Sequence, residues 1–234
     1  MIVKPIKTGV FQECENLFSF IIKHIKPIQE GSILVITSKI VALSEGRTIV
    51  AKDEKVKEKI IRKESDFAVP TKFVWLTLKD GMLMASAGID ESNAGGKLIL
   101  LPMDSYKTAR EIRKKLRKYF GVKKIGIIIT DSRTAPLRAG VIGVALGYAG
   151  FSGIKDYRGK PDIFGRKFHF SRVNVADSLA TSAVFVMGEG NEQCPLAVIE
   201  EASVKFCEKV LQKELIIGIE EDMYKPFFTK WRKS

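Results

Sequence analysis

Three short segments that combine a carboxylate with hydroxyl, amide or glycine neighbours are the places in the sequence where chemistry could occur. Their acidic residues are Asp90 in Gly88–Asn93, Asp131 in Thr130–Ser132 and Glu189 in Met187–Asn191. Carboxylate, hydroxyl and amide oxygens suit Mg²⁺ or Mn²⁺, which commonly bridge to substrate phosphates and orient a phosphoryl group for transfer. Because Asp and Asn are also ordinary turn residues, the spacing alone leaves a purely structural role open.

The expected secondary structure places each segment at the end of an element. The apolar run 125–130 predicts a buried strand that ends directly on Asp131, and residues 174–187 read as a helix that ends in a polar loop. The first segment follows a hairpin whose turn is 79–81. Further strands are expected at 2–6, from residue 32 in the run 32–41, at 97–102 and 195–202, and further helices at 14–26, 54–64 and from 104 or 105 to 119. Without a regular βαβ rhythm, the fold class is predicted as α+β.

The bulk composition indicates a globular protein with a basic surface. The chain has 234 residues, 45% of them apolar, and a formal net charge of +12. This length suits one large domain or two small interlocked lobes. A positive surplus fits nucleic acid, an anionic membrane surface or a phosphorylated small molecule, and charge alone does not choose among them.

Cysteine usage and the longest uncharged stretch point to a cytoplasmic protein without a membrane partner. Cys14, Cys194 and Cys207 show no paired spacing, which fits a reducing compartment. The stretch 139–154 is shorter than the roughly 18 apolar residues that a spanning helix needs, and the N-terminal residues do not read as a signal peptide.

Several common catalytic and cofactor motifs are absent from the sequence. No GxxxxGK[ST] phosphate loop, complete GxGxxG, HExxH or GxSxG occurs, and His24 and His169 have no paired cysteines beside them. A phosphate-loop nucleotide site, a zinc site and a serine-hydrolase site are therefore not expected.

A series of longer motifs resembles the F420-0:γ-glutamyl ligase family. In chain order these are TSKIVALSEGR, GIDESN, LLPMDS, IITDS, GVIGVALGYAG, DYRGKPDIFGR, NVADSLA and MGEGNEQCP. Their order and their span, over about residues 1–200, make the set far more specific than any single motif.

The resemblance implies an α+β fold of mixed sheets and helices, with residues 1–234 forming one ligase unit of two interlocked lobes in an intertwined homodimer. It implies GTP as phosphoryl donor, two divalent ions (Mg²⁺ or Mn²⁺) and K⁺ as a further ion. Asp90 and Asp131 would hold one metal; Ser132, where the family has threonine, and Glu189 would hold the second. The implied nucleotide contacts are Val10, Phe11, Gln12, Thr37, Ser38, Asn93, Met187, Gly188, Gly190, Asn191, Glu192, Gln193 and Cys194.

The reaction implied by the resemblance is amide-bond formation between L-glutamate and a carboxylate acceptor of the F420-0 type. Phosphorylation of the acceptor would give an acyl phosphate, which the glutamate amine then attacks. Because the enzyme must hold several anions together, cationic side chains are needed. Arg138 and Arg158 are the candidate catalytic residues, with Lys155 and Arg166 beside them, and a solvated surface role is an equal alternative for all four.

Glycines 140, 143, 147, 150 and 153 recur every three or four residues. Close backbone packing is the interpretation preferred for most of them, and room for a flat ring or a phosphate is the alternative.

Departures from the family pattern affect the acceptor more than the reaction class. Leu43 stands where the family often has lysine, Ser178 where an acidic residue is common, and 133–137 replaces a Gly-Arg-rich stretch. A folate-type acceptor is therefore kept as an alternative, as is a non-catalytic relative that only binds nucleotide.

A nucleic-acid-binding protein is the alternative from a different class. Its best feature is a cluster of cations on one expected helix: Arg110, Arg113, Lys114, Lys115, Arg117 and Lys118. A solvated face opposite Ala109, Ile112 and Leu116 explains the same spacing, and no RNP-type or helix-turn-helix pattern accompanies it. Small-molecule substrates, without nucleic acid, are therefore the expected partners.

Overall fold

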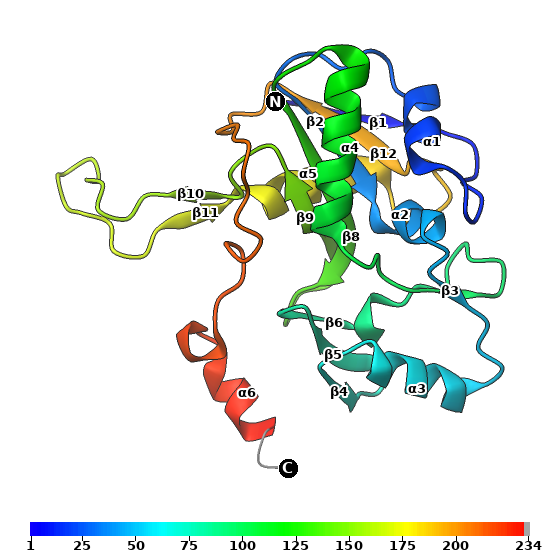
Figure 1. The fold of residues 1–234 in the computed structure, drawn as a ribbon. Helices are drawn as coiled ribbons and strands as arrows, with labels where there is room; N and C mark the ends of the chain where they lie inside the picture. Colours follow the sequence, from blue (N-terminus) through cyan, green and yellow to red (C-terminus); the bar gives the residue numbers. More distant parts are fainter. Residues whose placement is uncertain (232–234) are drawn as a thin grey trace.

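A five-stranded mixed sheet forms the centre of the computed structural model, which describes residues 1–231 (Figure 1). Its strand order is β1 (Ile2–Ile6), β12 (Leu196–Glu200), β2 (Ser32–Thr37), β8 (Ile125–Thr134) and β9 (Val141–Ala149). β2 and β8 run parallel, and every other neighbouring pair is antiparallel. The expected α+β class is confirmed, and no helix within residues 1–231 is long and apolar enough to cross a membrane.

Helices cover both faces of this sheet, which explains why β2 and β8 are almost continuous apolar runs. Leu34 and Ile36 of β2 pack with α1 (Leu17–His24) and α4 (Ser105–Phe120) on one face. Ile33 and Val35 pack with α5 (Val175–Met187) on the other. Since all four side chains are fully buried, each contributes roughly 1.5–3 kcal/mol of hydrophobic stabilisation.

Side-chain caps set where these three helices begin. Asn16, Asp104 and Asn174 accept hydrogen bonds from the backbone N–H groups three residues onward, which satisfies donors that the first helical turn leaves free. The helices predicted over 14–26, from 104 or 105 to 119 and over 174–187 are therefore confirmed. The first begins at Leu17 because Asn16 is its cap.

Several of the predicted strand bounds were wrong. β8 does not end at Asp131 but continues to Thr134, because β9 offers an antiparallel partner through Asp131↔Val144 and beyond. A register shift between Ile129 and Thr130 marks a bulge just before the carboxylate. The strand expected over 97–102 is limited to β7 (Leu98–Ile99), which pairs with β3 (Thr48–Ile49). The run from residue 32 leaves the sheet after Thr37 and becomes α2 (Ser38–Ser44).

A small three-stranded sheet lies beyond the carboxyl end of β8, at the bottom of Figure 1. It consists of β4 (Phe67–Pro70), β5 (Trp75–Lys79) and β6 (Met82–Ala85), with α3 (Glu54–Lys63) beside it. The predicted hairpin is confirmed, since Asp80 and Gly81 both adopt positive φ in its turn. The 3₁₀ turn η1 (Ser86–Gly88) then leads the chain back toward the central sheet.

A long two-stranded arm projects from the body of the molecule, at the left of Figure 1. It is formed by β10 (Ile154–Asp156) and β11 (Arg172–Asn174), and residues 157–171 make its loop. After β12 the chain descends past the central sheet to η2 (Ile219–Glu221) and α6 (Lys225–Trp231).

Close packing explains four of the five recurring glycines. A Cβ at Gly143 would lie 2.5 Å from the Ala180 carbonyl oxygen of α5, and one at Gly147 would lie 2.5 Å from the Ser105 carbonyl carbon of α4. Gly150 and Gly153 are equally crowded, whereas Gly140 faces open space in a turn. The preferred packing interpretation is confirmed for these four. At Gly143 and Gly147 two helices approach β9 closely, whereas Gly150 meets the Ile125 carbonyl and Gly153 meets the Tyr148 side chain.

We expect Gly147→Ala to lower the free energy of unfolding by about 1–3 kcal/mol, because α4 must move away from β9 to admit the methyl group. Urea-induced unfolding measures the change. Gly218→Ala is the control, since nothing lies near its Cβ position and its φ is negative. Equal stability of the two variants would contradict the close contact.

Candidate functional site

A cavity of about 300 Å³ lies at the carboxyl ends of the two parallel strands, where Thr37 of β2 is in register with Thr130 of β8. Most of its lining comes from five stretches far apart in the chain: 8–11, 37–40, 88–93, 130–132 and 187–195. Ligands of open sheets with parallel strands commonly bind at this edge, where loops from several strands meet.

Asp131 is the most electrostatically strained acid of the cavity. Its pKa is raised to about 6, mainly by burial and in addition by the nearby carboxylates of Asp90 and Glu189. The backbone N–H of Ser132 and the Ser38 hydroxyl, which donates to Asp131 Oδ1 at 3.1 Å, only partly offset this. The carboxylates of Asp90 and Glu189, from two other segments, are therefore close enough to repel that of Asp131.

Asp90 is held by a cation that sequence reasoning missed. Lys39 Nζ lies 2.7 Å from Asp90 Oδ2 and also donates to the backbone oxygen and hydroxyl of Ser92. Burial favours the protonated form of Asp90, but the hydrogen bonds from Lys39 and Ser92 outweigh it and keep its pKa below the ordinary value. Lys39 lies inside the quoted TSKIV motif, so its position next to Ser38 was the available signal.

The loop after α5 is folded around its own carboxylate. Glu192 accepts a hydrogen bond from the backbone N–H of Gly190 at 2.8 Å and sits so close to Gly188 that a Cβ there would lie 2.3 Å from its carboxyl carbon. Gly188 also has a φ of +80°, which favours glycine. The loop therefore depends on both the space and the backbone freedom of this residue.

Backbone hydrogen bonds attach this loop to the neighbouring strands. Thr8 N–H donates to the Gln193 carbonyl at 2.9 Å, and Thr37 N–H donates to the Pro195 carbonyl at 3.0 Å. The Asn93 side-chain amide lies 3.4 Å from the Gly190 carbonyl and links the loop to the Asp90 segment. Hydrogen bonds thus connect the loop 187–195 to the other segments that line the cavity.

Almost all predicted metal and nucleotide residues line this one cavity. The four predicted metal ligands Asp90, Asp131, Ser132 and Glu189 do so. So do the predicted nucleotide contacts Val10, Phe11, Thr37, Ser38, Asn93, Met187, Gly188, Gly190, Asn191, Glu192, Gln193 and Cys194. Gln12 is not part of the lining; its backbone N–H donates to the Glu15 carboxylate instead. Of the departures from the family pattern, Leu43 lines the cavity and Ser178 does not.

The two predicted catalytic arginines lie outside the cavity lining. Arg138 is in the turn between β8 and β9, where its backbone N–H donates to the Ala135 carbonyl. Arg158 is in the loop of the arm and forms an ion pair with Asp156 at 2.6 Å, which lowers the pKa of that carboxyl to about 2. A catalytic role for either arginine stays a prediction.

The oxygen donors around the cavity are of the type that hard divalent cations prefer. They surround the space rather than converge, and among residues 1–231 no three His, Cys, Asp or Glu side chains gather tightly enough to form a metal cluster. Burial, together with the carboxylates of Asp90 and Glu189, raises the pKa of Asp131, whereas Asp90 is paired with Lys39. The donor set fits a bound cation, which would relieve this repulsion.

We expect Asp131→Asn to stabilise the metal-free protein at neutral and alkaline pH. Because the folded-state pKa is raised from 3.8 to about 6, the stability linked to this group is present at low pH and is lost as pH rises through about 6. This increase in the pKa of Asp131 corresponds to ~3 kcal/mol of unfolding free energy at pH 8, which the neutral Asn side chain should restore. Urea unfolding in EDTA at pH 4.5 and pH 8 tests this; a variant less stable than the native protein at pH 8 would contradict it.

Comparison with known proteins agrees with these observations. The family described as F420-0:Gamma-glutamyl ligase matches residues 5–201. The coenzyme F420:L-glutamate ligase of Methanococcus maripaludis strain C6 is 36% identical over 218 residues, covering 85% of this chain and 87% of that protein. Ligases of the same name from Methanopyrus kandleri and Methanocaldococcus jannaschii are 37% identical over 190 residues (73% of this chain, 75% of the relative) and 33% identical over 228 residues (90% of each). The chain belongs to the F420-0:γ-glutamyl ligase family.

Proposed function

We propose that this protein is an amide-forming ligase that uses GTP and divalent metal ions to join L-glutamate to the carboxylate of an F420-0-type acceptor. The observation that carries the proposal is the meeting of Asp90, Asp131 and Glu189, from three distant segments, around one cavity. The names of the relatives, which are coenzyme F420:L-glutamate ligases, supply the substrate class.

The reaction proceeds through an acyl phosphate, because a free carboxylate does not acylate an amine in water. An acceptor carboxylate oxygen attacks the γ-phosphorus of GTP and GDP leaves. The glutamate amine then attacks the acyl carbon, phosphate leaves, and the amine proton passes to solvent. Bound divalent ions supply charge neutralisation for the phosphates, with Asp90 and Asp131 as the proposed ligands of one ion and Ser132 and Glu189 of the other.

The other cavity residues bind and orient the substrates. The loop 187–195 is braced by its bonds to Thr8, Thr37 and Asn93, so its backbone and side-chain polar groups are held in place against the nucleotide. Lys39 keeps Asp90 ionised and fixes the segment that carries it. Such pre-organisation limits the reorganisation needed when substrate binds.

The first test is a mass-spectrometric assay with glutamate, Mg²⁺ or Mn²⁺, and either GTP or ATP. F420-0 and folates serve as parallel acceptors, since Leu43 in the cavity wall is a departure that bears on the folate alternative. We expect F420-0 to gain one glutamyl mass per turnover with release of phosphate in the presence of GTP. Nucleotide binding without product from any acceptor would instead support a non-catalytic relative.

In the same assay, Asp131→Asn should reduce glutamate-dependent phosphate release by at least about 100-fold, because it removes a proposed ligand of the divalent ion that would neutralise the phosphates. Circular dichroism checks that the variant is folded. Asp80→Asn, in the β5–β6 turn and outside the cavity lining, is the matched control and should retain activity. Turnover of Asp131→Asn equal to that of the control would refute the assigned role.

We also propose that the protein is a homodimer in which the arm reaches the partner subunit. Ile163, Phe164 and Phe170 in the arm loop are 91%, 89% and 90% exposed, and large apolar side chains gathered on a projecting hairpin are typical of an interaction surface. An exchanged arm would bring Arg158 toward the partner's cavity, although Arg158 lies outside the cavity of its own chain.

The double substitution Ile163→Asp with Phe164→Asp should convert the dimer to a monomer and lower turnover, because charged side chains cannot be buried unpaired in an apolar interface. Light scattering after size exclusion measures the mass. Phe73→Asp is the control, since Phe73 is 84% exposed but lies near the small sheet, outside the arm. A monomeric native protein at micromolar concentration would contradict the proposal.

A further inference from the structure

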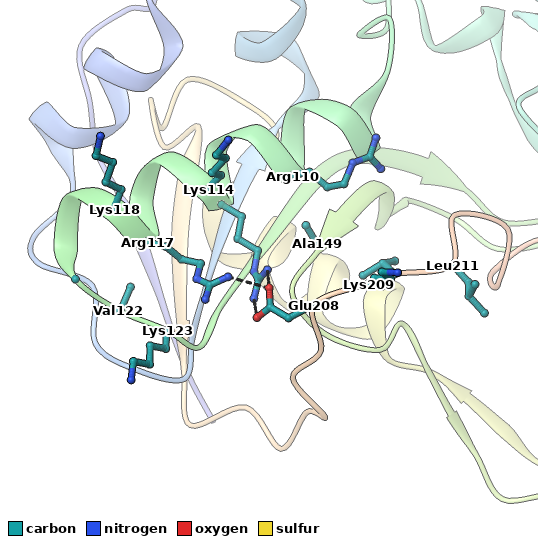
Figure 2. Close-up of a pocket in the computed structure, with 13 residues that line it drawn as sticks. Arg110, Lys114, Arg117, Lys118, Val122, Lys123, Ala149, Glu208, Lys209 and Leu211 are labelled. Atoms are coloured by element: carbon teal, nitrogen blue, oxygen red, sulfur yellow. Dashed lines mark hydrogen bonds and ion pairs between the residues drawn. The ribbon is translucent and has the colours of Figure 1, made fainter.

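A second hollow, of about 830 Å³, lies between the C-terminal half of α4 and the segment that follows residue 206 (Figure 2). Arg110, Lys114 and Lys118 extend along one wall, on α4, and Glu208 and Lys209 come from the opposite wall. We call this hollow the basic groove. None of the predicted metal or nucleotide residues belongs to it.

The basic groove is remote from the proposed catalytic cavity. Arg113, which lines it, donates from Nε to the carbonyl of Ile125 at 2.9 Å, so the groove lies at the beginning of β8. Asp131 lies six residues further along the strand. At 3.3 Å per residue the two are about 20 Å apart, and a small molecule in the groove does not contact the cavity.

Two guanidinium groups at the base of the groove are already arranged around an oxyanion. Arg113 is only 8% exposed, and its Nη1 and Nη2 donate to the two Glu208 carboxylate oxygens at 2.9 and 3.1 Å. Arg117 Nη1 donates to Glu208 at 2.8 Å, as the dashed lines in Figure 2 show. Such a bidentate arrangement is rigid and suits carboxylate or phosphate geometry.

The remaining cations of the groove form no salt bridge in the part of the chain that the structure describes. Within residues 1–231, no salt bridge joins Arg110, Lys114, Lys118 or Lys123 to a carboxylate. Arg110, Lys114 and Lys118 follow each other at intervals of four residues, about 6 Å along the helix axis. By contrast Lys115, on another side of α4, lies over the Phe18 ring. Some basic side chains of α4 thus line the groove, and Lys115 lies on a separate face. A helix whose cations were all merely solvated would not have this division.

Apolar side chains complete the groove. Ala149, Val122 and Leu211 also line the hollow, which therefore combines cationic and apolar side chains. Its volume falls within the roughly 300–1,000 Å³ of small-molecule sites. A long polyanion would need a basic surface that continues beyond these walls, whereas the groove is bounded by the segment 208–211.

We propose that the basic groove is a second ligand site, which binds a compact small molecule carrying several oxyanion groups, phosphate or carboxylate, separately from the ligase cavity. Arg113 and Arg117, held by Glu208, form its rigid base, and Arg110, Lys114 and Lys118, which form no salt bridge within residues 1–231, supply the charges that contact the ligand. The proposal does not depend on the proposed ligase reaction, because its evidence lies at the other end of the sheet.

The test is isothermal titration of the full chain in EDTA with inorganic tripolyphosphate and, in a separate arm, with citrate, which distinguishes phosphate from carboxylate ligands. We expect saturable binding of at least one of them with one site per chain. The double variant Arg110→Glu/Lys114→Glu should weaken the Kd at least about tenfold. Lys107→Glu/Lys115→Glu makes the same change in net charge on the same helix, outside the groove, and should leave the Kd within about twofold of the native value.

Three outcomes would overturn the proposal. One is the absence of saturable binding of either probe by the folded native chain. Another is equal weakening by the two double variants, which would show that only net charge attracts the anion. The third is tight binding of a 20-nucleotide random-sequence single-stranded DNA without binding of tripolyphosphate or citrate, which would identify a nucleic-acid surface instead. The Asp131→Asn variant should bind the probes as the native chain does, which separates this site from the cavity.

Discussion

The parallel pairing of β2 with β8 is the contact on which the rest of the molecule depends. It sets Thr37 beside Thr130, so Ser38, which follows β2, lies next to Asp131. A slip by one residue would turn each side chain of the strand to the opposite face and would exchange the two hydrophobic cores. Because helices cover both faces of the sheet, packing of the core fixes this register. The register in turn fixes the positions of the cavity residues at the strand ends.

The carboxylates of the cavity at this edge lower the stability of the folded protein. Asp131 is partly buried near two other carboxylates, an environment that raises its pKa and that a bound cation would relieve. The Lys39–Asp90 ion pair offsets part of the repulsion. Groups held in an unfavourable electrostatic state are common where a protein binds charged substrates, because the ligand or metal then supplies the missing partner. The surrounding backbone hydrogen bonds supply the rigidity that keeps these groups together.

The two ends of the central sheet present opposite electrostatic surroundings. Acidic side chains gather at the carboxyl end of β8, and basic side chains gather at its beginning, around the C-terminal turns of α4. The helix contributes to this division, because cations are favoured near its carboxyl end. Gly147 lets α4 lie directly against β9, so the wall of the basic groove is fixed to the same core that positions the cavity. Part of the net charge of +12 is therefore concentrated in the basic groove.

The sequence by itself determined the fold class and most helices and strands, because apolar periodicity and caps are local properties. The site residues named from its family resemblance nearly all line the candidate cavity. The sequence also indicated correctly that most of the recurring glycines serve packing. It did not reveal that β8 runs on past Asp131, since that extension depends on β9 as a partner. Nor did it reveal Lys39 as the counter-ion of Asp90, or the sorting of the α4 cations between a groove and a separate face. These are contacts between residues distant in the chain, and only tertiary packing brings such charges within a few ångströms of each other.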